Sequence, residues 1–210
     1  MPAAYYIPEF ITEQEEEQLL KQVYAVPKPK WVTLSNRRLQ NWGKRGMLVE
    51  PLPDWLTWPL KRIEERGLSI FPATTPANHC LVNEYAAGQG IMPHEDGPMY
   101  LPCVATLSLG SHAVLDFTPR ETTTNTGCFS LFLAPRSLFV QRDQLYELYL
   151  HGIAETTADD LSNERRASPL LLPPPEPYDS RQGRVERGMR VSLTYRRVAR
   201  SINKPKLLLR

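Results

Sequence analysis

The chain has 210 residues, and 41% of them are hydrophobic, which suffices for one domain with a substantial core but would be cramped for two. The formal net charge of +2 neither favours nor excludes a polyanionic partner. No apolar run approaches the ~20 residues of a membrane-spanning helix, and the N-terminus lacks the basic and apolar regions of a secretory signal.

Three cysteines, Cys80, Cys103 and Cys128, occur at spacings that fit neither a disulfide framework nor a metal site. We interpret them as free or buried thiols in a reducing compartment. The expected location is therefore the cytoplasm or the nucleus, with no membrane partner. We also expect the protein to be a monomer.

Two helices are expected in the N-terminal extension, residues 1–77. After the aromatic, β-leaning stretch YYIPEFI, Thr12 and Glu15 have the spacing of a capping box, which predicts that a helix begins here. Pro27 and Pro29 should end this helix. Its buried face would contain Leu19, Leu20, Val23 and Tyr24.

The second helix is predicted over residues 54–66, with Gly67 as the residue that follows its C-terminus. This stretch contains Pro59, which we expect near the first turn, because proline lacks the N–H that later helical positions donate.

From about residue 78 the pattern changes to short apolar or alternating runs separated by Gly, Pro and Asp turns. These runs predict a mainly β (α+β) fold, a barrel or a double-sheet jelly roll, over residues 78–200. Residues 158–188 interrupt them with SPLLLPPPEPYD, whose prolines cannot donate to a β-ladder. We therefore predict an inserted, mobile Pro-rich loop within a single domain of residues 1–210.

The stretch PHEDGPMY carries the first chemical signal. Because strand side chains alternate between faces, His94 and Asp96 share a face and Glu95 points away. One imidazole and one carboxylate are two of the three ligands of a facial iron site, and a second histidine must come from a distant strand.

Three other histidines are available, and His151 fits best because it ends an apolar run and a glycine follows it. His112 lies inside an apparent strand and His79 lies just before one, so we interpret both as structural.

The second signal is RVSLTYR, in which Arg190, Ser192, Thr194 and Arg196 share one strand face. Two arginines on an inward face need anions, and a small dicarboxylate would satisfy both. Asn83 and Tyr85, in LVNEY, similarly share a face. The alternative is a basic strand on a solvated surface.

The order of these motifs resembles that of the AlkB family of Fe(II)- and 2-oxoglutarate-dependent dioxygenases. The motifs are N-x-Y, H-x-D, a distant H-G and R-x-S-x-T-x-R. The stretches PANHCLVNEY, GIMPHEDGP, LHGIAE and RVSLTYRRV are most similar to the AlkB homologue six group, and the resemblance covers nearly the whole chain.

The resemblance implies a double-stranded β-helix, a jelly roll, with the N-terminal helices packed outside it. His94, Asp96 and His151 are the expected catalytic and iron-binding residues. The residues expected to hold 2-oxoglutarate are Asn83, Tyr85, Arg190, Ser192 and Arg196. With O2, oxidation of a substrate C–H bond would be coupled to decarboxylation of 2-oxoglutarate to succinate, and a hydroxylated N-methyl group would leave as formaldehyde.

A basic, aromatic stretch lies between Glu17 and Glu50, where the chain has no acidic residue. Cations for phosphate and rings for stacking suit a single-stranded or flipped-out nucleic acid. In AlkB-like enzymes this region forms a lid over the site. The expected substrate contacts are therefore Lys30, Trp31, Arg37, Arg38 and Trp42. The alternative is a solvated basic surface with tryptophans packed on the core.

Three functions stay open at this point. The first is oxidative demethylation or hydroxylation of a nucleobase in DNA or RNA, and the second is the same chemistry on a protein side chain. The third is a nucleic-acid-binding module with little turnover. The complete set of metal and cosubstrate positions favours an enzyme.

Overall fold

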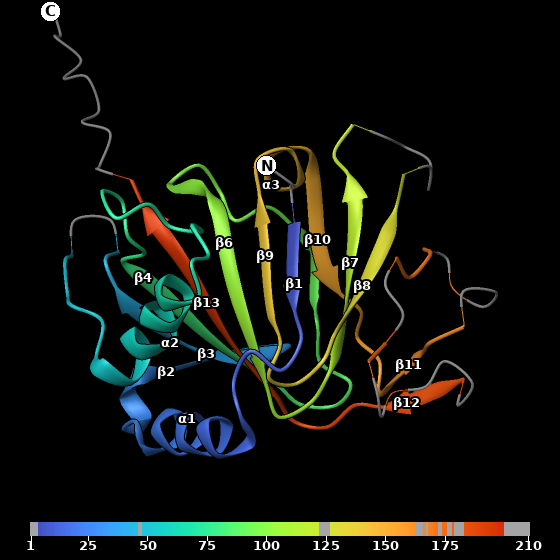
Figure 1. The fold of residues 1–210 in the computed structure, drawn as a ribbon. Coiled ribbons are helices and arrows are strands. Elements are labelled where there is room, and N and C mark those ends of the chain that lie inside the picture. Colours follow the sequence, from blue (N-terminus) through green and yellow to red (C-terminus); the bar gives the residue numbers. More distant parts are fainter. Residues whose placement is uncertain are drawn as a thin grey trace, which may run out of the picture.

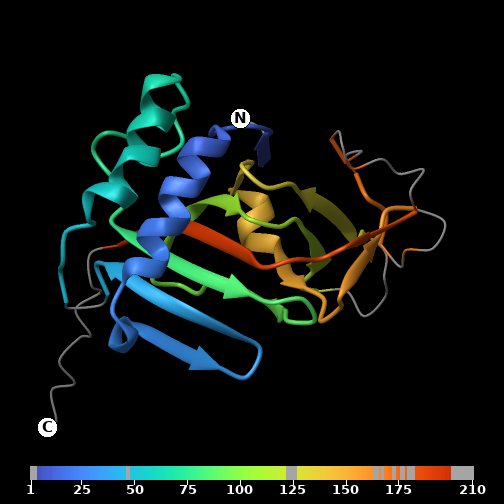
Figure 2. The same ribbon diagram turned by 90° about the horizontal axis from the view of Figure 1, so that it is seen from below.

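The computed structural model describes residues 4–45, 48–121, 127–162, 166, 168–171, 174–175, 178 and 183–199. Within them, two antiparallel sheets face each other, and two helices cover the outer side of the larger sheet (Figures 1 and 2). This arrangement confirms the predicted mainly β, jelly-roll architecture. No helix in the described part of the chain is long and apolar enough to cross a membrane.

The larger sheet contains the N-terminal strands as well as half of the jelly roll. Its seven described strands run in the order β1 (Ala4–Ile7), β9 (Leu138–Arg142), β6 (Tyr100–Leu109), β13 (Arg190–Val198), β4 (His79–Tyr85), β3 (Arg37–Gly43) and β2 (Trp31–Leu34). The chain therefore returns at its end, in β13, to the centre of this sheet between β6 and β4. The β2–β3 hairpin forms one edge (Figure 2).

The smaller sheet has four described strands in the order β5 (Ile91–His94), β10 (Tyr149–Ile153), β7 (Ala113–Pro119) and β8 (Phe129–Leu133). Five-residue helix α3 (Gln144–Leu148) leads from β9 in the larger sheet into β10 in the smaller one. From β4 to β10 the chain thus alternates between the two sheets, apart from the consecutive β7 and β8, and this places residues distant in sequence around one interior.

Helix α1 (Glu13–Ala25) begins as predicted, because Thr12 and Glu15 form a complete capping box. It buries Leu19 and Val23 against the outer face of the larger sheet, followed by a single 3-10 turn, η1 (Lys28–Lys30). The expected burial of Tyr24 is wrong: this side chain is 45% exposed and stacks on Trp31.

Helix α2 (Asp54–Glu65) also lies where predicted, and Gly67 follows it with a left-handed φ of 67°. Pro59, however, lies inside the helix and not in its first turn, because the helix already begins at Asp54. Pro59 is buried, so its ring contributes to the apolar face that packs on the sheet. Packing of this face compensates for the donor that proline lacks.

The predicted inserted loop, residues 158–188, contains a pair of short strands among its described residues. Its two ends pair as β11 (Ala158–Asp160) and β12 (Arg184–Glu186). The carboxylate of Asp159, on β11, is buried and accepts two hydrogen bonds from Arg187, at 2.6 and 2.7 Å. Residues 163–165, 167, 172–173, 176–177 and 179–182 lie outside the described residues, so the predicted mobility stays a prediction.

His112 is structural, as predicted, but it does not lie within a strand. It occupies the connection between β6 and β7, where its Nε2 lies 3.1 Å from Asp159 and its ring stacks on Phe132. His79 begins β4 and is buried against the ring of Tyr100.

Candidate active site

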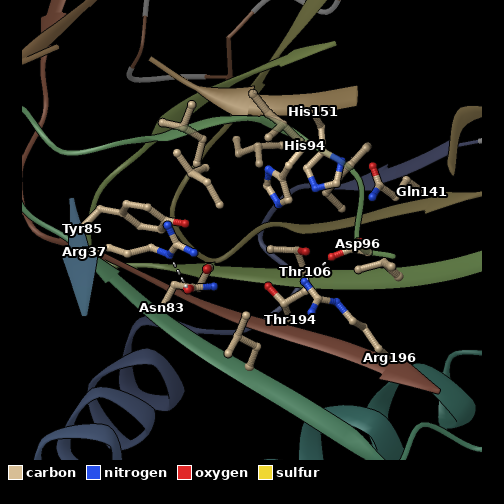
Figure 3. A pocket seen from close by; sticks show the side chains of 18 of the residues that line it. Arg37, Asn83, Tyr85, His94, Asp96, Thr106, Gln141, His151, Thr194 and Arg196 are labelled. Atoms are coloured by element: carbon tan, nitrogen blue, oxygen red, sulfur yellow. Dashed lines mark hydrogen bonds and ion pairs between the residues drawn. The ribbon is translucent and has the colours of Figure 1, made fainter. Parts of the chain in front are cut away.

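A cavity of about 210 Å³ opens between the two sheets (Figure 3). Strands of both sheets contribute to its wall, the larger sheet mostly with polar side chains and the smaller sheet with apolar ones and two histidines. The strand β13 shows why. Val191, Leu193 and Tyr195 are buried in the core beneath the helices, so Arg190, Ser192, Thr194 and Arg196 all face the cavity, which confirms the predicted alternation.

His94, Asp96 and His151 meet at one end of this cavity. His94 is directly opposite His151 in the pairing of β5 with β10, and their ring centroids are 4.5 Å apart. Asp96 follows two residues after the end of β5, so it reaches the cluster from a loop and not from the strand that the sequence suggested. One ligand atom from each residue lies within 4.8 Å of the other two.

Both imidazoles present a ring nitrogen to the cluster. The Nδ1 of His94 lies 2.9 Å from the carbonyl oxygen of Met92, which can only accept, so Nδ1 donates to this carbonyl and Nε2 is the nitrogen left for a metal. Burial lowers the pKa of His151 to about 4, so its ring is neutral at physiological pH. Two imidazole nitrogens and one carboxylate oxygen fit ferrous ion, and they leave positions open on one side.

The two carboxylate oxygens of Asp96 have different surroundings. Its Oδ1 forms an ion pair with Arg196, whereas its buried Oδ2 has no hydrogen-bond partner among the described residues. The guanidinium of Arg196 also lies 4.8 Å from the ring centroid of Tyr100. A cation at the cluster would satisfy the orphaned oxygen.

Arg190 occupies the far part of the cavity. It is 4% exposed, donates one hydrogen bond of 3.0 Å to the hydroxyl of Ser108, and stands 5.8 Å from the ring centroid of Tyr85. Its buried Nε has no hydrogen-bond partner among the described residues, and burial lowers its pKa to about 10. At neutral pH the arginine is still charged, so an anionic ligand is the missing partner.

The other side chains expected at the cosubstrate line the same wall. Ser192 is paired with Asn83 across β13 and β4, and Tyr85 is paired with Arg190. The amide oxygen of Asn83 accepts a hydrogen bond of 3.3 Å from Arg37. The structure therefore brings together all eight residues that the sequence assigned to metal and cosubstrate.

The five expected substrate contacts separate into two groups. Because β3 pairs with β4, Arg37 faces the cavity and its neighbour Arg38 faces the helices. Trp42 and Trp31 pack against the core beneath the helices, and Lys30 lies 4.2 Å above the ring centroid of Trp42. The predicted stacking platform over the cavity is therefore wrong for both tryptophans, and of the five only Arg37 lines it.

Three of the seven cations of the basic stretch also have acidic partners. Arg38 forms two hydrogen bonds with Glu84, at 2.5 and 2.8 Å, and Lys30 and Arg45 both approach Glu50. The sequence conceals this compensation because the acidic partners lie outside residues 18–49.

The environment of Trp42 yields a prediction that separates core packing from base stacking. Its ring meets that of Trp55 edge-on at 5.5 Å, and its Nε1 donates to Gln40. We expect Trp42→Ala to lower the free energy of unfolding by up to about 3 kcal/mol. Oligonucleotide affinity per folded molecule should be unchanged. Melting temperature and affinity measured on one preparation test this, and weaker binding at full stability would contradict it.

Polar residues on β9 and β6 escaped the sequence reasoning. Gln141 lies on β9, and Phe139 and Gln141 face the cavity while Val140 faces the helices. The signal was present, since a glutamine at an inward position of the apolar run SLFVQRD is unusual. Thr106 on β6, which lines the cavity, and Ser108, which accepts a hydrogen bond from Arg190, were also missed.

Comparisons with known proteins agree with this geometry. Residues 25–196 match the model of the 2OG-Fe(II) oxygenase superfamily. "Probable RNA/DNA demethylase ALKBH6" of Danio rerio is 49% identical over 174 residues, which cover 77% of this chain and 73% of that protein. "Uncharacterized protein L905" of Acanthamoeba polyphaga mimivirus is 27% identical and covers 91% of this chain and 83% of its own length.

Solved structures show the same fold. OsALKBH1 superposes with a TM-score of 0.61 at 14% identity over 94% of this chain and 99% of its own. A 2OG-Fe(II) family oxidoreductase from Burkholderia pseudomallei superposes with a TM-score of 0.60 at 12% identity. The match covers 95% of this chain and 87% of that one. The family match and the close relative together place the chain in the 2OG-Fe(II) oxygenase superfamily, as an AlkB-type enzyme that uses Fe(II), 2-oxoglutarate and O2.

Proposed function

We propose that this enzyme oxidatively removes an alkyl group from a nitrogen of a nucleobase in DNA or RNA, with His94, Asp96 and His151 as the iron ligands. The observation that carries the proposal is the convergence of these three side chains in one cavity with two buried arginines. Bound iron with its cosubstrate supplies the oxidation of a substrate C–H bond, and the protein supplies position and shielding.

The cosubstrate would lie along β13, in the direction given by the two arginines. Arg196 is tied to Asp96 and so serves the end of 2-oxoglutarate nearest the metal. Arg190, whose Nε is unpaired, would take the distal carboxylate, with Tyr85 beside it. Asn83 and Ser192 present polar groups between these two ends.

A nucleic acid substrate is supported by the RNA/DNA demethylase activity for which the Danio rerio relative is named, and by Arg37. Arg37 lines the cavity, and no carboxylate among the described residues pairs with it. It is therefore available for a phosphate or for the edge of a base. The free cysteines in the structure suit a reducing compartment, and we propose the cytoplasm or the nucleus.

Arg37→Ala is expected to weaken the binding of single-stranded oligonucleotides of all sequences alike. If Arg37 contacts a phosphate, the slope of log affinity against log salt should decrease by about 1. Lys30→Ala is the matched control, because Lys30 lies over Trp42 on the opposite side of the sheet and should leave the slope unchanged. Equal slopes in wild type and Arg37→Ala would contradict a phosphate contact.

The activity itself is tested by mass spectrometry of methylated DNA, RNA and peptide pools incubated with Fe(II), ascorbate and 2-oxoglutarate. We expect loss of a methyl group from a nucleic acid pool, with formaldehyde and succinate formed in equal amounts. A reaction confined to the peptide pool would refute the nucleic acid substrate while leaving the enzyme class intact. A wild-type protein that forms no succinate under any condition would instead favour a binding module.

A protein side chain is the second candidate, and one observation favours it. Lys30, Arg38 and Arg45 already have acidic partners, so the surface around the hairpin offers less free positive charge than the sequence suggests. A peptide substrate would need fewer phosphate contacts than a nucleic acid strand.

A further inference from the structure

Gln141 is a buried glutamine of the cavity wall whose side-chain oxygen lacks a hydrogen-bond partner among the described residues. It is 4% exposed, and its Oε1 is fully buried without a hydrogen bond. Gln40, the buried glutamine on the opposite face of the same sheet, is bonded twice, to the Val23 carbonyl and the Trp42 indole. Buried polar atoms are almost always paired, so the Oε1 of Gln141 indicates a ligand.

The strand register places Gln141 beside the iron-binding cluster. Arg196 is paired with Val104, and Val104 is paired with Gln141, so the three lie in one row across β13, β6 and β9. Arg196 approaches Asp96 from one end of this row. The small apolar Val104 leaves space above the row, and Gln141 closes its other end. Figure 3 shows the amide near His151 and Asp96, on the side away from Tyr85 and Arg37.

This position excludes the distal carboxylate of the cosubstrate as the partner. Arg190, which we assign to that carboxylate, lies toward the other end of β13, and an ionised carboxylate only accepts hydrogen bonds, as does the Oε1 of Gln141. Asp96 is excluded as well, because its orphaned Oδ2 is an acceptor, as is the Oε1 of Gln141. The missing partner of the Gln141 Oε1 must donate a hydrogen bond and be small enough for the end of the cavity. A water molecule meets both requirements.

We propose that Gln141 is a positioning residue that accepts a hydrogen bond from a water molecule held at the metal beside Asp96 and His151. The contact rests on the proposed metal site. A cation polarises the water that it binds and makes it a stronger donor, which suits a neutral amide oxygen as acceptor. Holding this water would keep one metal position filled until the substrate enters the cavity.

The test uses Mn(II) as a probe, because paramagnetic Mn(II) accelerates the relaxation of water protons that reach its coordination sphere. Mn(II) affinity is first measured by calorimetry for wild type, Gln141→Leu and Gln141→Met. Water-proton relaxation is then measured with Mn(II) and saturating 2-oxoglutarate. We expect both variants to keep Mn(II) affinity within about threefold and to lose roughly half of the relaxation enhancement, because the water loses its protein partner.

Gln40→Leu is the matched control, since it removes the same amide from a site where the amide is fully bonded. It should lower the melting temperature by several degrees and leave the relaxation enhancement unchanged. Gln141→Leu should melt at or above the wild-type temperature, because it removes an unpaired polar atom. A further readout is how tightly 2-oxoglutarate decarboxylation is coupled to substrate oxidation. Gln141→Leu should form more succinate in the absence of substrate than wild type does.

Unchanged relaxation in both Gln141 variants, with Mn(II) still bound, would overturn the proposal. Loss of folding in both variants would also overturn it, because Gln141 would then be a structural residue. A wild-type protein that binds no Mn(II) would overturn the proposed metal site first and the water contact with it, so the two failures are distinguishable.

Discussion

His94→Ala is expected to abolish turnover and nearly all metal binding. Loss of an outer hydrogen bond to a metal ligand typically costs 10–100-fold in affinity, so loss of one of three direct ligands should cost more than about 100-fold. We expect this variant to fold normally, because His94 lies at the cavity wall and its described hydrogen bond is to the nearby carbonyl of Met92. Its melting temperature should therefore stay close to that of the metal-free wild type.

Asp96→Ala should show the same loss of metal with an additional loss of stability. Arg196 is buried and pairs with Asp96, so the substitution leaves a buried charge without its partner. Such a change typically costs about 3–5 kcal/mol. Calorimetry with Mn(II) and thermal unfolding of the two variants separate these effects. Mn(II) affinity within tenfold of wild type in either variant would refute the assigned ligands.

Arg190→Ala is expected to weaken 2-oxoglutarate binding by roughly 2–5 kcal/mol, at least about 30-fold in Kd, because it removes the partner of a buried carboxylate. Arg190→Lys should not restore the affinity, since an ammonium group cannot form two parallel hydrogen bonds with a carboxylate. Ser108→Ala is the control. It removes only the hydroxyl that accepts from Arg190, so its effect should be within about tenfold.

The measurement for Arg190 is calorimetry of 2-oxoglutarate with Mn(II)-loaded protein, supported by thermal shift. At 100 times the wild-type Kd the ligand should raise the unfolding free energy of wild type by about 2.7 kcal/mol, and at the same concentration that of Arg190→Ala by about 0.9 kcal/mol or less. The pH dependence has a defined sign. Burial lowers the pKa of Arg190 to about 10, and only the protonated form binds. Affinity should be flat at neutral pH and fall as pH rises through 10. Unchanged affinity in Arg190→Ala would contradict the assignment.

The sequence predicts the interior of this protein well because alternation in a strand is a local property. Once RVSLTYR is assigned to a strand, covalent geometry places Arg190 and Arg196 on the same face. The apolar Val191, Leu193 and Tyr195 then lie on the other face, which packs beneath the helices. The capping box at Thr12 is equally local, and it is present. The pairing of His94 with His151 could be proposed from motifs, but only the sheet shows that they are directly opposite.

Predictions that depend on pairing between distant segments were less successful. Whether Arg37 or Arg38 faces the cavity is decided by the register of β3 against β4, in which Arg38 is paired with Glu84. A count of basic residues does not contain that register, so it overestimated the free charge near the site. The missed role of Gln141 has the same origin, since its neighbours in the row come from β6 and β13.

A crystal structure of the protein with Mn(II) and 2-oxoglutarate tests the central assignment most directly. The account predicts one anomalous scattering peak within coordination distance of His94, Asp96 and His151. It also predicts cosubstrate density that runs from this peak to Arg190, with Arg196 beside Asp96. A metal bound elsewhere, or a distal carboxylate that makes no contact with Arg190, would contradict it.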